Sequence, residues 1–432
     1  MIIVPAVAAL LVLMSRVPVA LAHAVLLRAD PPDLCLLPGG ESLPSDTPVC
    51  RTGTLLSEAP RSVALVFSEP VEPMGRGLRV IGPDGRRVDR GRASVAGPEV
   101  RVAIDARSAG TYRAVWSVVS PDTHPEFGTM TFSVRRAGGV VAEETPAGGA
   151  PAALGTTLGA LAHLLHFTGY VLGFGAFAAA WLAGRPRAPS GGPAAAPDAL
   201  WRIVGLGVVL LLLAEPVALA AESVALGAVG GGADPSVIGA VLDSSFGRVL
   251  SQRLAAAILL WVLAGALRSG ALRAAWTVPL LGACLAFADG QAAHAIGVRP
   301  AWWGLAVNTV HLGAMGLWGG TLALVLLSLP ASRSPAIPPA SVQRLAVIGG
   351  VAAVATGIVM AFQHLTGFRD LIANPYGRTL VVKIGAVVVA AGLGWFGVRG
   401  APAPRRLAWE AAAMLAVLAL AGLLVLLRPP VP

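Results

Sequence analysis

Charged residues, and lysine above all, are scarce in this sequence. Only 13% of its 432 residues are charged, and Lys383 is the one lysine. A soluble globular domain carries about 25% charged residues, so most of this chain is expected to lie in a lipid bilayer. Nucleic-acid binding needs a basic soluble face. The sequence shows no such face, so no nucleic-acid partner is expected.

Sulfur-containing residues are scarce as well, with three cysteines and seven methionines. Cys284 stands alone in an apolar run, which favours a small core residue over a metal ligand. Cys35 and Cys50 flank a loop rich in Pro, Gly and Ser, and we expect a disulfide between them in an exported domain. The sequence has no Gly-rich phosphate loop of the Walker type, so ATP is not expected to supply energy within this chain.

The first 22 residues have the pattern of a signal peptide. An apolar core precedes Ala20 and Ala22, which occupy the small-residue positions before a cleavage site. The start carries no Lys or Arg, and Arg16 falls late in the segment, so an uncleaved anchor or a different start codon remains an alternative. Cleavage after Ala22 makes His23 the first residue, with a free amine beside its imidazole ring.

Residues 23–136 predict an all-β domain. Short apolar runs such as RSVALVF, EVRVAI and TYRAVWSVV often alternate with polar residues and are separated by Pro, Gly and Asp. Several such strands over about 100 residues are typical of an immunoglobulin-like β-sandwich. The next segment, 137–154, is rich in Gly, Ala and Pro and is predicted to be a flexible linker.

Eight apolar segments follow within residues 155–432, each near the roughly 20 residues that a spanning helix needs. They are predicted at 155–184, 200–223, 248–268, 271–289, 301–330, 342–365, 378–398 and 405–428. With the β-domain outside, ten arginines fall in cytoplasmic loops and five at the outer ends, as the positive-inside rule requires. The sequence therefore predicts a multi-pass protein of a bacterial inner or plasma membrane, with both termini on the outer side.

The helical part contains an internal repeat. SSFGRVLSQRL opens the third predicted helix, and NPYGRTLVVKI opens the seventh. The matched pairs are Phe246 and Tyr376, Gly247 and Gly377, Arg248 and Arg378, Leu250 and Leu380, and Arg253 and Lys383. Two four-helix halves in the same orientation explain this repeat, and parallel repeats of that kind occur in transporters.

Asp122 and His124 are candidate metal ligands in the β-domain. Residues i and i+2 of an extended strand point to the same side, so both side chains can face one metal ion. With the amine and imidazole of His23 they offer nitrogen and carboxylate donors, a set that suits tetragonal Cu(II). The alternative is that Asp122 caps a turn before Pro125 and that His124 is a solvated loop residue.

Three stretches of the β-domain, HAVLLRADPPD, VALVFSEPVEP and SPDTHPEFGTMTFSV, resemble the copper-resistance protein C (CopC) domain. In the helical part, HLGAMGLWGG and NPYGRTLVVK resemble its membrane partner CopD, so nearly the whole chain is similar to a CopC–CopD fusion. The resemblance implies that His23, Asp122 and His124 bind Cu(II) as a histidine brace. The loop with Cys35 and Cys50 is not part of the CopC pattern; it could shield the copper site or dock onto the membrane domain.

Ionisable residues are few in the helical part, and such groups are unfavourable in hydrocarbon. Nearly all of them fall in the predicted outer half, which indicates an ion-accepting vestibule that opens towards the β-domain. The predicted copper pathway consists of His163, His166, Glu215, Glu222, His294, His311 and His364, with Asp289 beside His294. For each histidine the alternative is a hydrogen bond between helices, and Glu222 and His364 can also lie among lipid headgroups.

Three cations accompany these residues, namely Lys383, Arg248 and Arg378. They can extend towards the membrane surface or balance the carboxylates, and the balancing role is expected only for Lys383. Tyr376 and Gly377 belong to the repeated motif beside Arg378. The glycines of GLWGG are more typical of close helix packing than of a conduction path.

Copper handling is the predicted function. The exported domain captures Cu(II), and the helices move copper, as Cu(I) or Cu(II), inward across the membrane. Copper, lipid and periplasmic chaperones or a reductase are the expected partners. Sequestration or sensing without transport is the main alternative. A membrane haem protein, with His163 and His311 as iron ligands, and a copper monooxygenase are less favoured, and no enzymatic activity is expected.

Overall fold

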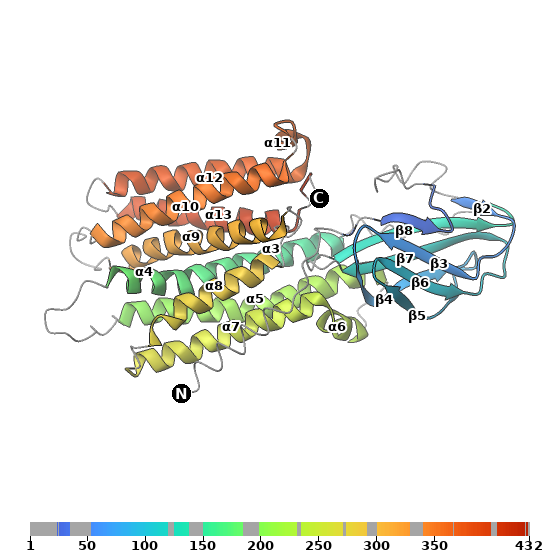
Figure 1. Ribbon diagram of the computed structural model, residues 1–432, viewed down its shortest axis with the longest axis horizontal. Coiled ribbons are helices and arrows are strands. Elements are labelled where there is room, and N and C mark those ends of the chain that lie inside the picture. The colour runs from blue at the N-terminus through green and yellow to red at the C-terminus, as the bar shows by residue number, and fades with distance from the viewer. Residues whose placement is uncertain are drawn as a thin grey trace. The chain divides into compact units, whose positions relative to one another are not determined.

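A computed structural model shows the arrangement of strands and helices in this chain (Figure 1). It describes residues 24, 26–34, 53–119, 125–137, 150–184, 198–230, 235–270, 274–291, 300–328, 340–365, 367–398, 404–427 and 429–430. Contacts between residues divide the chain into two compact units. One holds the strands together with residues 222–248, and the other, called the helical unit below, holds residues 156–221 and 249–432.

Two four-stranded sheets form the β-domain, in the orders β1-β3-β6-β5 and β2-β8-β7-β4. The strands are β1 (Leu26–Asp30), β2 (Thr54–Leu56), β3 (Ser62–Phe67), β4 (Glu72–Ile81), β5 (Asp89–Ala96), β6 (Glu99–Ile104), β7 (Gly110–Val119) and β8 (Pro125–Val134). β2 pairs with β8 in parallel, and the other paired strands are antiparallel. The predicted β-sandwich is confirmed.

Alternation of side chains explains why these segments form strands. In β6, Val100, Val102 and Ile104 are buried, whereas Arg101 between them is exposed. A strand turns successive side chains to opposite faces. Each apolar residue of β6 therefore enters the core, and each intervening residue faces away from it.

Aromatic side chains fill the space between the two sheets. Phe67 of β3 meets Trp116 of β7 edge-on, with ring centroids 5.2 Å apart. Tyr112 stacks on Phe132 at the same centroid distance, and neither ring is exposed to solvent. Tyr112 and Trp116 are therefore core residues of the sandwich. Burial of such side chains contributes about 1.5–3 kcal/mol each to stability.

The first membrane helix begins earlier than the sequence pattern predicts. It is built from α3 (Ala150–Tyr170), a π-helical turn η1 (Val171–Gly175) and α4 (Ala176–Ala183). Its first five residues fall in the segment 137–154, which is therefore not wholly a linker. Pro151 does not prevent this start, because a proline in the first helical turn has no backbone hydrogen bond to lose.

Most of the remaining helices follow the predicted apolar segments, whereas the short helices α6 and α11 lie outside them. They are α5 (Asp198–Gly230), α6 (Pro235–Leu242), α7 (Ser245–Arg268), α8 (Thr277–Gln291), α9 (Ala301–Ser328), α10 (Ala340–His364), α11 (Asp370–Ala373), α12 (Pro375–Val398) and α13 (Pro404–Val425). Among the described residues, seven helical segments are long and apolar enough to cross a membrane. The one predicted segment that is not among these seven, 271–289, corresponds to α8, which has 15 residues. A span needs roughly 20, so the eighth span stays a prediction.

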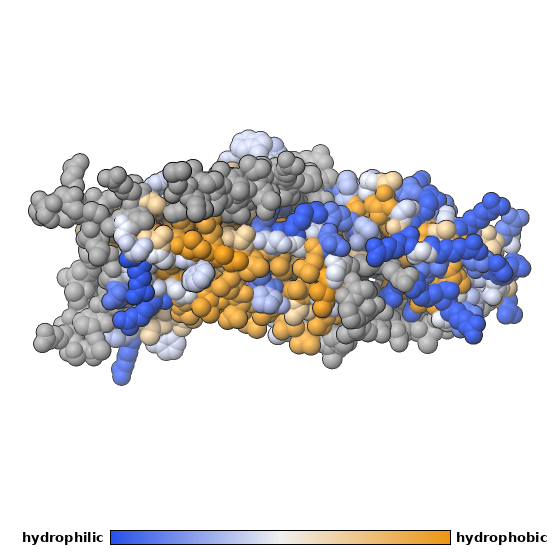
Figure 2. Space-filling model, turned by 90° about the horizontal axis from the view of Figure 1, so that it is seen from below, coloured by the Kyte–Doolittle hydropathy of each residue, from blue (hydrophilic) through white to orange (hydrophobic). Residues whose placement is uncertain are grey.

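Large apolar side chains are exposed on these helices. Figure 2 shows hydrophobic residues gathered over the helices on one face of the molecule, whereas hydrophilic residues gather over the strands. Trp261, Val351, Phe362, Val388 and Trp409 are among the exposed apolar residues. Extended exposed apolar surface marks contact with a membrane or another protein, and together with seven apolar helices it identifies a membrane domain.

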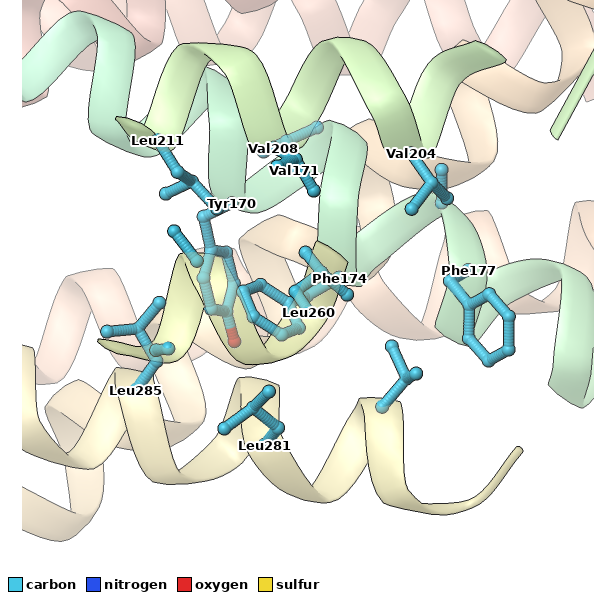
Figure 3. Close-up of a cluster of buried hydrophobic side chains, with 14 of the residues drawn as sticks. Tyr170, Val171, Phe174, Phe177, Val204, Val208, Leu211, Leu260, Leu281 and Leu285 are labelled. Carbon is cyan, nitrogen blue, oxygen red and sulfur yellow. The ribbon is translucent and has the colours of Figure 1, made fainter. Parts of the chain in front are cut away.

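The first helix, α5, α7 and α8 supply most of one core inside the helical unit, and α9 and α13 also contribute to it. Figure 3 shows Tyr170, Val171, Phe174 and Phe177 of the first helix against Val204, Val208 and Leu211 of α5, Leu260 of α7, and Leu281 and Leu285 of α8. The hydroxyl group of Tyr170 donates a hydrogen bond to the carbonyl oxygen of Gly282, 3.1 Å away. The polar end of this buried ring is therefore satisfied.

Glycines let α9 approach the first helix closely. A Cβ atom on Gly320 would lie 2.2 Å from the carbonyl carbon of Gly175. A Cβ atom on Gly175 would in turn lie 2.0 Å from the carbonyl oxygen of Gly316. The prediction that the GLWGG segment is a packing surface is confirmed.

The two copies of the repeated motif have the same local structure. Each copy follows a short helix, α6 before α7 and α11 before α12. A Cβ atom on Gly247 would lie 2.2 Å from the carbonyl oxygen of Leu242, and one on Gly377 would lie 1.9 Å from that of Asp370. In both copies a glycine therefore lets the first turn of the long helix pack closely against the short helix.

Candidate functional site

Strand residues that flank the predicted copper ligands in the sequence lie at one end of the β-sandwich. Leu26, the first residue of β1, pairs with Phe67, the last residue of β3. Val119, the last residue of β7, pairs with Glu72, the first residue of β4. Only residues 68–71 separate Phe67 from Glu72. Leu26 and Val119 thus lie at the same end of the sandwich.

The copper ligands themselves, His23, Asp122 and His124, lie outside the described residues, and so do Cys35 and Cys50. The copper brace and the disulfide remain predictions from sequence.

Two buried carboxylates lie at this end of the sandwich. Glu69 is in the connection from β3 to β4, Glu126 is the second residue of β8, and each is 3% exposed. A buried carboxylate is unfavourable unless it is paired or hydrogen-bonded. The sequence analysis did not single out either residue. The sequence does contain a signal for such buried acids. Each is a glutamate within an apolar run that resembles a strand, VALVFSEPV for Glu69 and PEFGTMTFSV for Glu126.

In the helical unit, four helices bring together a buried charged cluster. It consists of His166 on α3, Glu215 on α5, Arg253 on α7 and Asp289 on α8, and we call it the acid–histidine cluster. His166 and Glu215 are 1% and 2% exposed, and Asp289 is 6% exposed. Ionisable groups so deep among membrane helices are rare and usually functional.

Asp289 connects two members of this cluster. Its Oδ1 atom accepts a hydrogen bond from Arg253 Nε at 2.8 Å, and its Oδ2 atom lies 2.9 Å from His166 Nε2. An ionised carboxylate only accepts hydrogen bonds, so His166 Nε2 carries a hydrogen and donates it to Asp289. In the neutral imidazole the other ring nitrogen, Nδ1, then keeps its lone pair.

Glu215 faces the free nitrogen of this imidazole. Its Oε1 atom lies 3.4 Å from His166 Nδ1. Neither Nδ1 nor the second oxygen of Glu215, Oε2, has a hydrogen-bond partner among the described residues. Two carboxylates share one guanidinium, so the cluster has one excess negative charge when His166 is neutral. Such a charge favours a bound cation.

His311 makes different contacts, between α9 and α10. Its Nδ1 atom lies 3.0 Å from the hydroxyl oxygen of Thr356, and that hydroxyl donates to the carbonyl oxygen of Ala352 at 2.6 Å. A hydroxyl group has one hydrogen to donate, so His311 Nδ1 donates to Thr356, and Nε2 of a neutral His311 is left as an acceptor. Lys383 of α12 acts electrostatically on His311.

The cation that balances Asp289 is Arg253, whereas the sequence analysis expected a balancing role only for Lys383. Arg253 is the residue that matches Lys383 in the internal repeat. A sequence signal for this role was present, because an arginine two turns inside an apolar helix needs a partner.

The other histidines of the predicted pathway lie at helix contacts. His163 Nδ1 donates to the carbonyl oxygen of Gly159 on its own helix, 2.9 Å away. A Cβ atom on Gly422 of α13 would lie 3.0 Å from His163 Cβ, so the two helices touch there. His364 is buried at the end of α10, with its ring centroid 6.3 Å from that of Tyr376.

Two further residues of the predicted pathway are not part of the acid–histidine cluster as described. Glu222 is buried, but its contacts assign it to the unit that holds the strands. His294 lies outside the described residues.

Arg248 and Arg378, which follow the matched glycines of the repeated motif, are exposed. Arg248 forms an ion pair with Glu72 of β4 at 2.7 Å, and the second carboxylate oxygen of Glu72 accepts a hydrogen bond from the backbone N–H of Ser245. An exposed pair of this kind contributes about 0–1 kcal/mol. Arg378 is also exposed, whereas its neighbour Gly377 is buried and donates its backbone N–H to Asn374 Oδ1.

Comparisons with known proteins agree with this architecture. Residues 47–135 match the family model of the CopC domain. Protein YobA of Escherichia coli (strain K12) is 33% identical over 84 residues, which cover 18% of this chain and 68% of YobA. The chain belongs to the CopC family. Its β-sandwich is thus a CopC domain, as the sequence motifs predicted.

Similarity extends from the CopC domain into the helices. The copper transport protein CutJ of Bacillus subtilis (strain 168) is 27% identical over 366 residues, which cover 78% of this chain. The chain spans 64% of the length of CutJ. A CopC domain followed by a helical membrane domain confirms the predicted CopC–CopD fusion. The crystal structure of CopC from Methylosinus trichosporium OB3b is 21% identical, covers 26% of this chain and 93% of that chain, and has a TM-score of 0.20.

Proposed function

We propose that this protein captures Cu(II) with its CopC domain and moves copper inward across the membrane through its helices. His23, Asp122 and His124 are the capturing ligands, with the CopC domain on the outer side of a bacterial plasma membrane. The observation that supports this proposal is that Leu26 and Val119, the described strand residues nearest to these ligands in the sequence, lie at the same end of the sandwich. The buried carboxylates of Glu69 and Glu126 add negative charge at that end.

The helical unit provides the second half of this proposal. With a neutral His166, the acid–histidine cluster is a buried position with one excess negative charge, and nitrogen and carboxylate donors are ligands that copper accepts. His163, His311 and His364 are further copper-binding positions along the pathway. The matched motifs at the start of α7 and α12 support two four-helix halves.

Capture of copper is tested by the mature N-terminus and by electron paramagnetic resonance. We expect the exported protein to begin at His23 by mass spectrometry and to bind Cu(II) with a nitrogen-rich tetragonal signal. His124→Ala is expected to abolish that signal. Asp84→Asn changes an exposed carboxylate of the same domain and should leave the signal intact. Retention of residues 1–22, or a signal that persists in His124→Ala, would contradict the brace.

Transport is distinguished from sequestration by copper uptake into vesicles. Proteoliposomes with the CopC domain outside are expected to accumulate copper, and His166→Ala should reduce the initial rate at least tenfold. If copper binds to the protein but does not enter the vesicle lumen, the protein is a sequestering or sensing protein. The absorption spectrum of the purified protein tests the haem alternative, because absence of a Soret band would exclude bound haem.

A further inference from the structure

We propose that Asp289 and Arg253 are positioning residues that prepare His166 Nδ1 and Glu215 Oε1 as a pair of ligands for Cu(II). This inference rests on the proposed function and states how one membrane copper site binds its ion. Arg253 holds Asp289, Asp289 holds His166, and His166 together with Glu215 contacts the copper ion.

The two ligand atoms lie close to the separation that a shared Cu(II) ion requires. With bonds of about 2.0–2.1 Å to an imidazole nitrogen and a carboxylate oxygen, and the angle of about 90° of a tetragonal Cu(II) ion, those two atoms are about 2.9 Å apart, so the side chains approach each other by about 0.5 Å when the ion binds. The separation of His166 Nδ1 and Glu215 Oε1 is 3.4 Å. Without a proton or a cation between them, two electron pairs face each other across this gap.

The role of Asp289 follows from the second nitrogen of the imidazole. A histidine that binds a metal usually donates its other ring N–H to a carboxylate, which fixes the tautomer and the ring orientation. Asp289 Oδ2 accepts that bond at 2.9 Å, and Arg253 Nε fixes the other oxygen of the same carboxylate at 2.8 Å. With both oxygens occupied by protein hydrogen-bond donors, Asp289 is assigned to holding the ring.

Burial gives a second, independent indication of a ligand. His166 Nδ1 and Glu215 Oε2 are buried without hydrogen-bond partners among the described residues, and an unsatisfied buried polar atom is unfavourable by about 1–3 kcal/mol. Among the residues that the structure describes, no group of three or more His, Cys, Asp or Glu side chains is arranged to hold a metal. Two ligands make a weak position, which suits an ion that must leave again.

The test uses the full-length protein in lipid nanodiscs, with His124→Ala present to remove the copper signal of the CopC domain. Cu(II) alone is titrated and followed by electron paramagnetic resonance. This His124→Ala protein is the parent of the variants below. It is expected to keep a Cu(II) signal with nitrogen coupling that is weaker than the signal of the CopC domain. Asp289→Asn is expected to lower the affinity of this site about 10–100-fold, as loss of a hydrogen-bonding partner behind a metal ligand does.

The spectrum at saturating copper distinguishes a positioning residue from a ligand. Asp289→Asn should keep the spectrum of the parent, because the ligands are unchanged, whereas Glu215→Gln should alter it. Glu410→Gln is the matched control for Glu215→Gln, since Glu410 is a buried glutamate of α13 outside the cluster. It should bind copper like the parent. Arg253→Lys keeps a positive charge but removes the Nε donor that fixes Asp289 Oδ1. Its copper affinity is therefore expected to fall as well, which tests the same chain of contacts if Asp289→Asn does not fold.

Three results would overturn the inference. Unchanged affinity in both Asp289→Asn and Arg253→Lys would show that neither residue positions His166. An altered saturated spectrum in Asp289→Asn would make Asp289 a ligand. If the His124→Ala parent binds no Cu(II), the membrane copper site of the proposed function fails as well. In the first two results copper still binds in the membrane, so the proposed function stands.

Discussion

Arg253→Gln is expected to destabilise the helical unit by about 3–5 kcal/mol, because removal of one partner of a buried ion pair leaves an uncompensated charge. The Arg253 and Asp289 side chains are 13% and 6% exposed, with 2.8 Å between Nε and Oδ1. Without the guanidinium, Asp289 and Glu215 share only the imidazole of His166. Thermal unfolding of the purified protein in detergent, followed by tryptophan fluorescence, would measure the loss.

Arg248→Gln is the matched control for this prediction. Arg248 lies five positions earlier on α7, and it too is paired with a carboxylate, but its side chain is 54% exposed. Loss of an exposed pair is expected to change stability by about 0–1 kcal/mol. The double variant Arg253→Gln/Asp289→Asn should recover much of the stability, because it removes both charges together. Equal melting temperatures for Arg253→Gln and Arg248→Gln would contradict the importance of the buried pair.

Gly320→Val is expected to disrupt the packing of α9 against the first helix, with a loss of about 3 kcal/mol or more. A Cβ atom at position 320 would lie 2.2 Å from the carbonyl carbon of Gly175 and 2.4 Å from the backbone nitrogen of Ala176. Both clashing atoms belong to the backbone, so no change of side-chain rotamer relieves the clash. The two helices have to separate, and the Gly175 and Gly316 contact is lost with them.

Gly313→Val provides the control within the same helix. A Cβ atom on Gly313 would meet nothing within 4 Å, and the substitution makes the same change of residue type in α9. We expect it to keep stability within about 1 kcal/mol of the parent. The fraction of monodisperse protein after detergent extraction, together with the melting temperature, would compare the two variants. Similar behaviour of both would show that the helix contact tolerates a larger side chain.

Much of the architecture was predictable because the signals that determine it are local. The alternation of Val100, Arg101 and Val102 identifies a strand without knowledge of its neighbours. Long apolar runs likewise identify α5, α7, α9, α10, α12 and α13. The start of α3 at Ala150 was missed, because Gly, Ala and Pro in a linker and in a first helical turn look alike.

The acid–histidine cluster was only partly predictable, because it is assembled from four separate helices. His166 and Glu215 stood out as polar residues in apolar segments, and Asp289 was noted beside His294 at the end of a predicted helix. The link from Arg253 through Asp289 to His166 joins residues up to 123 positions apart. The hydrophobic periodicity of a single helix carries no information about a contact between separate helices. The repeat identified Arg253 only as the counterpart of Lys383.

The π-helical turn at Val171–Gly175 limits how this protein family can change. Each residue of an α-helix advances the side-chain direction by 100°, so this turn determines the relative rotation of the helix before and after it. His166 and Tyr170 on one side, and Phe174 and Phe177 near and beyond its end, all enter the same interior. Loss or gain of one residue here would turn one of these groups towards lipid. Related chains can therefore vary the residue types of this helix more readily than its length.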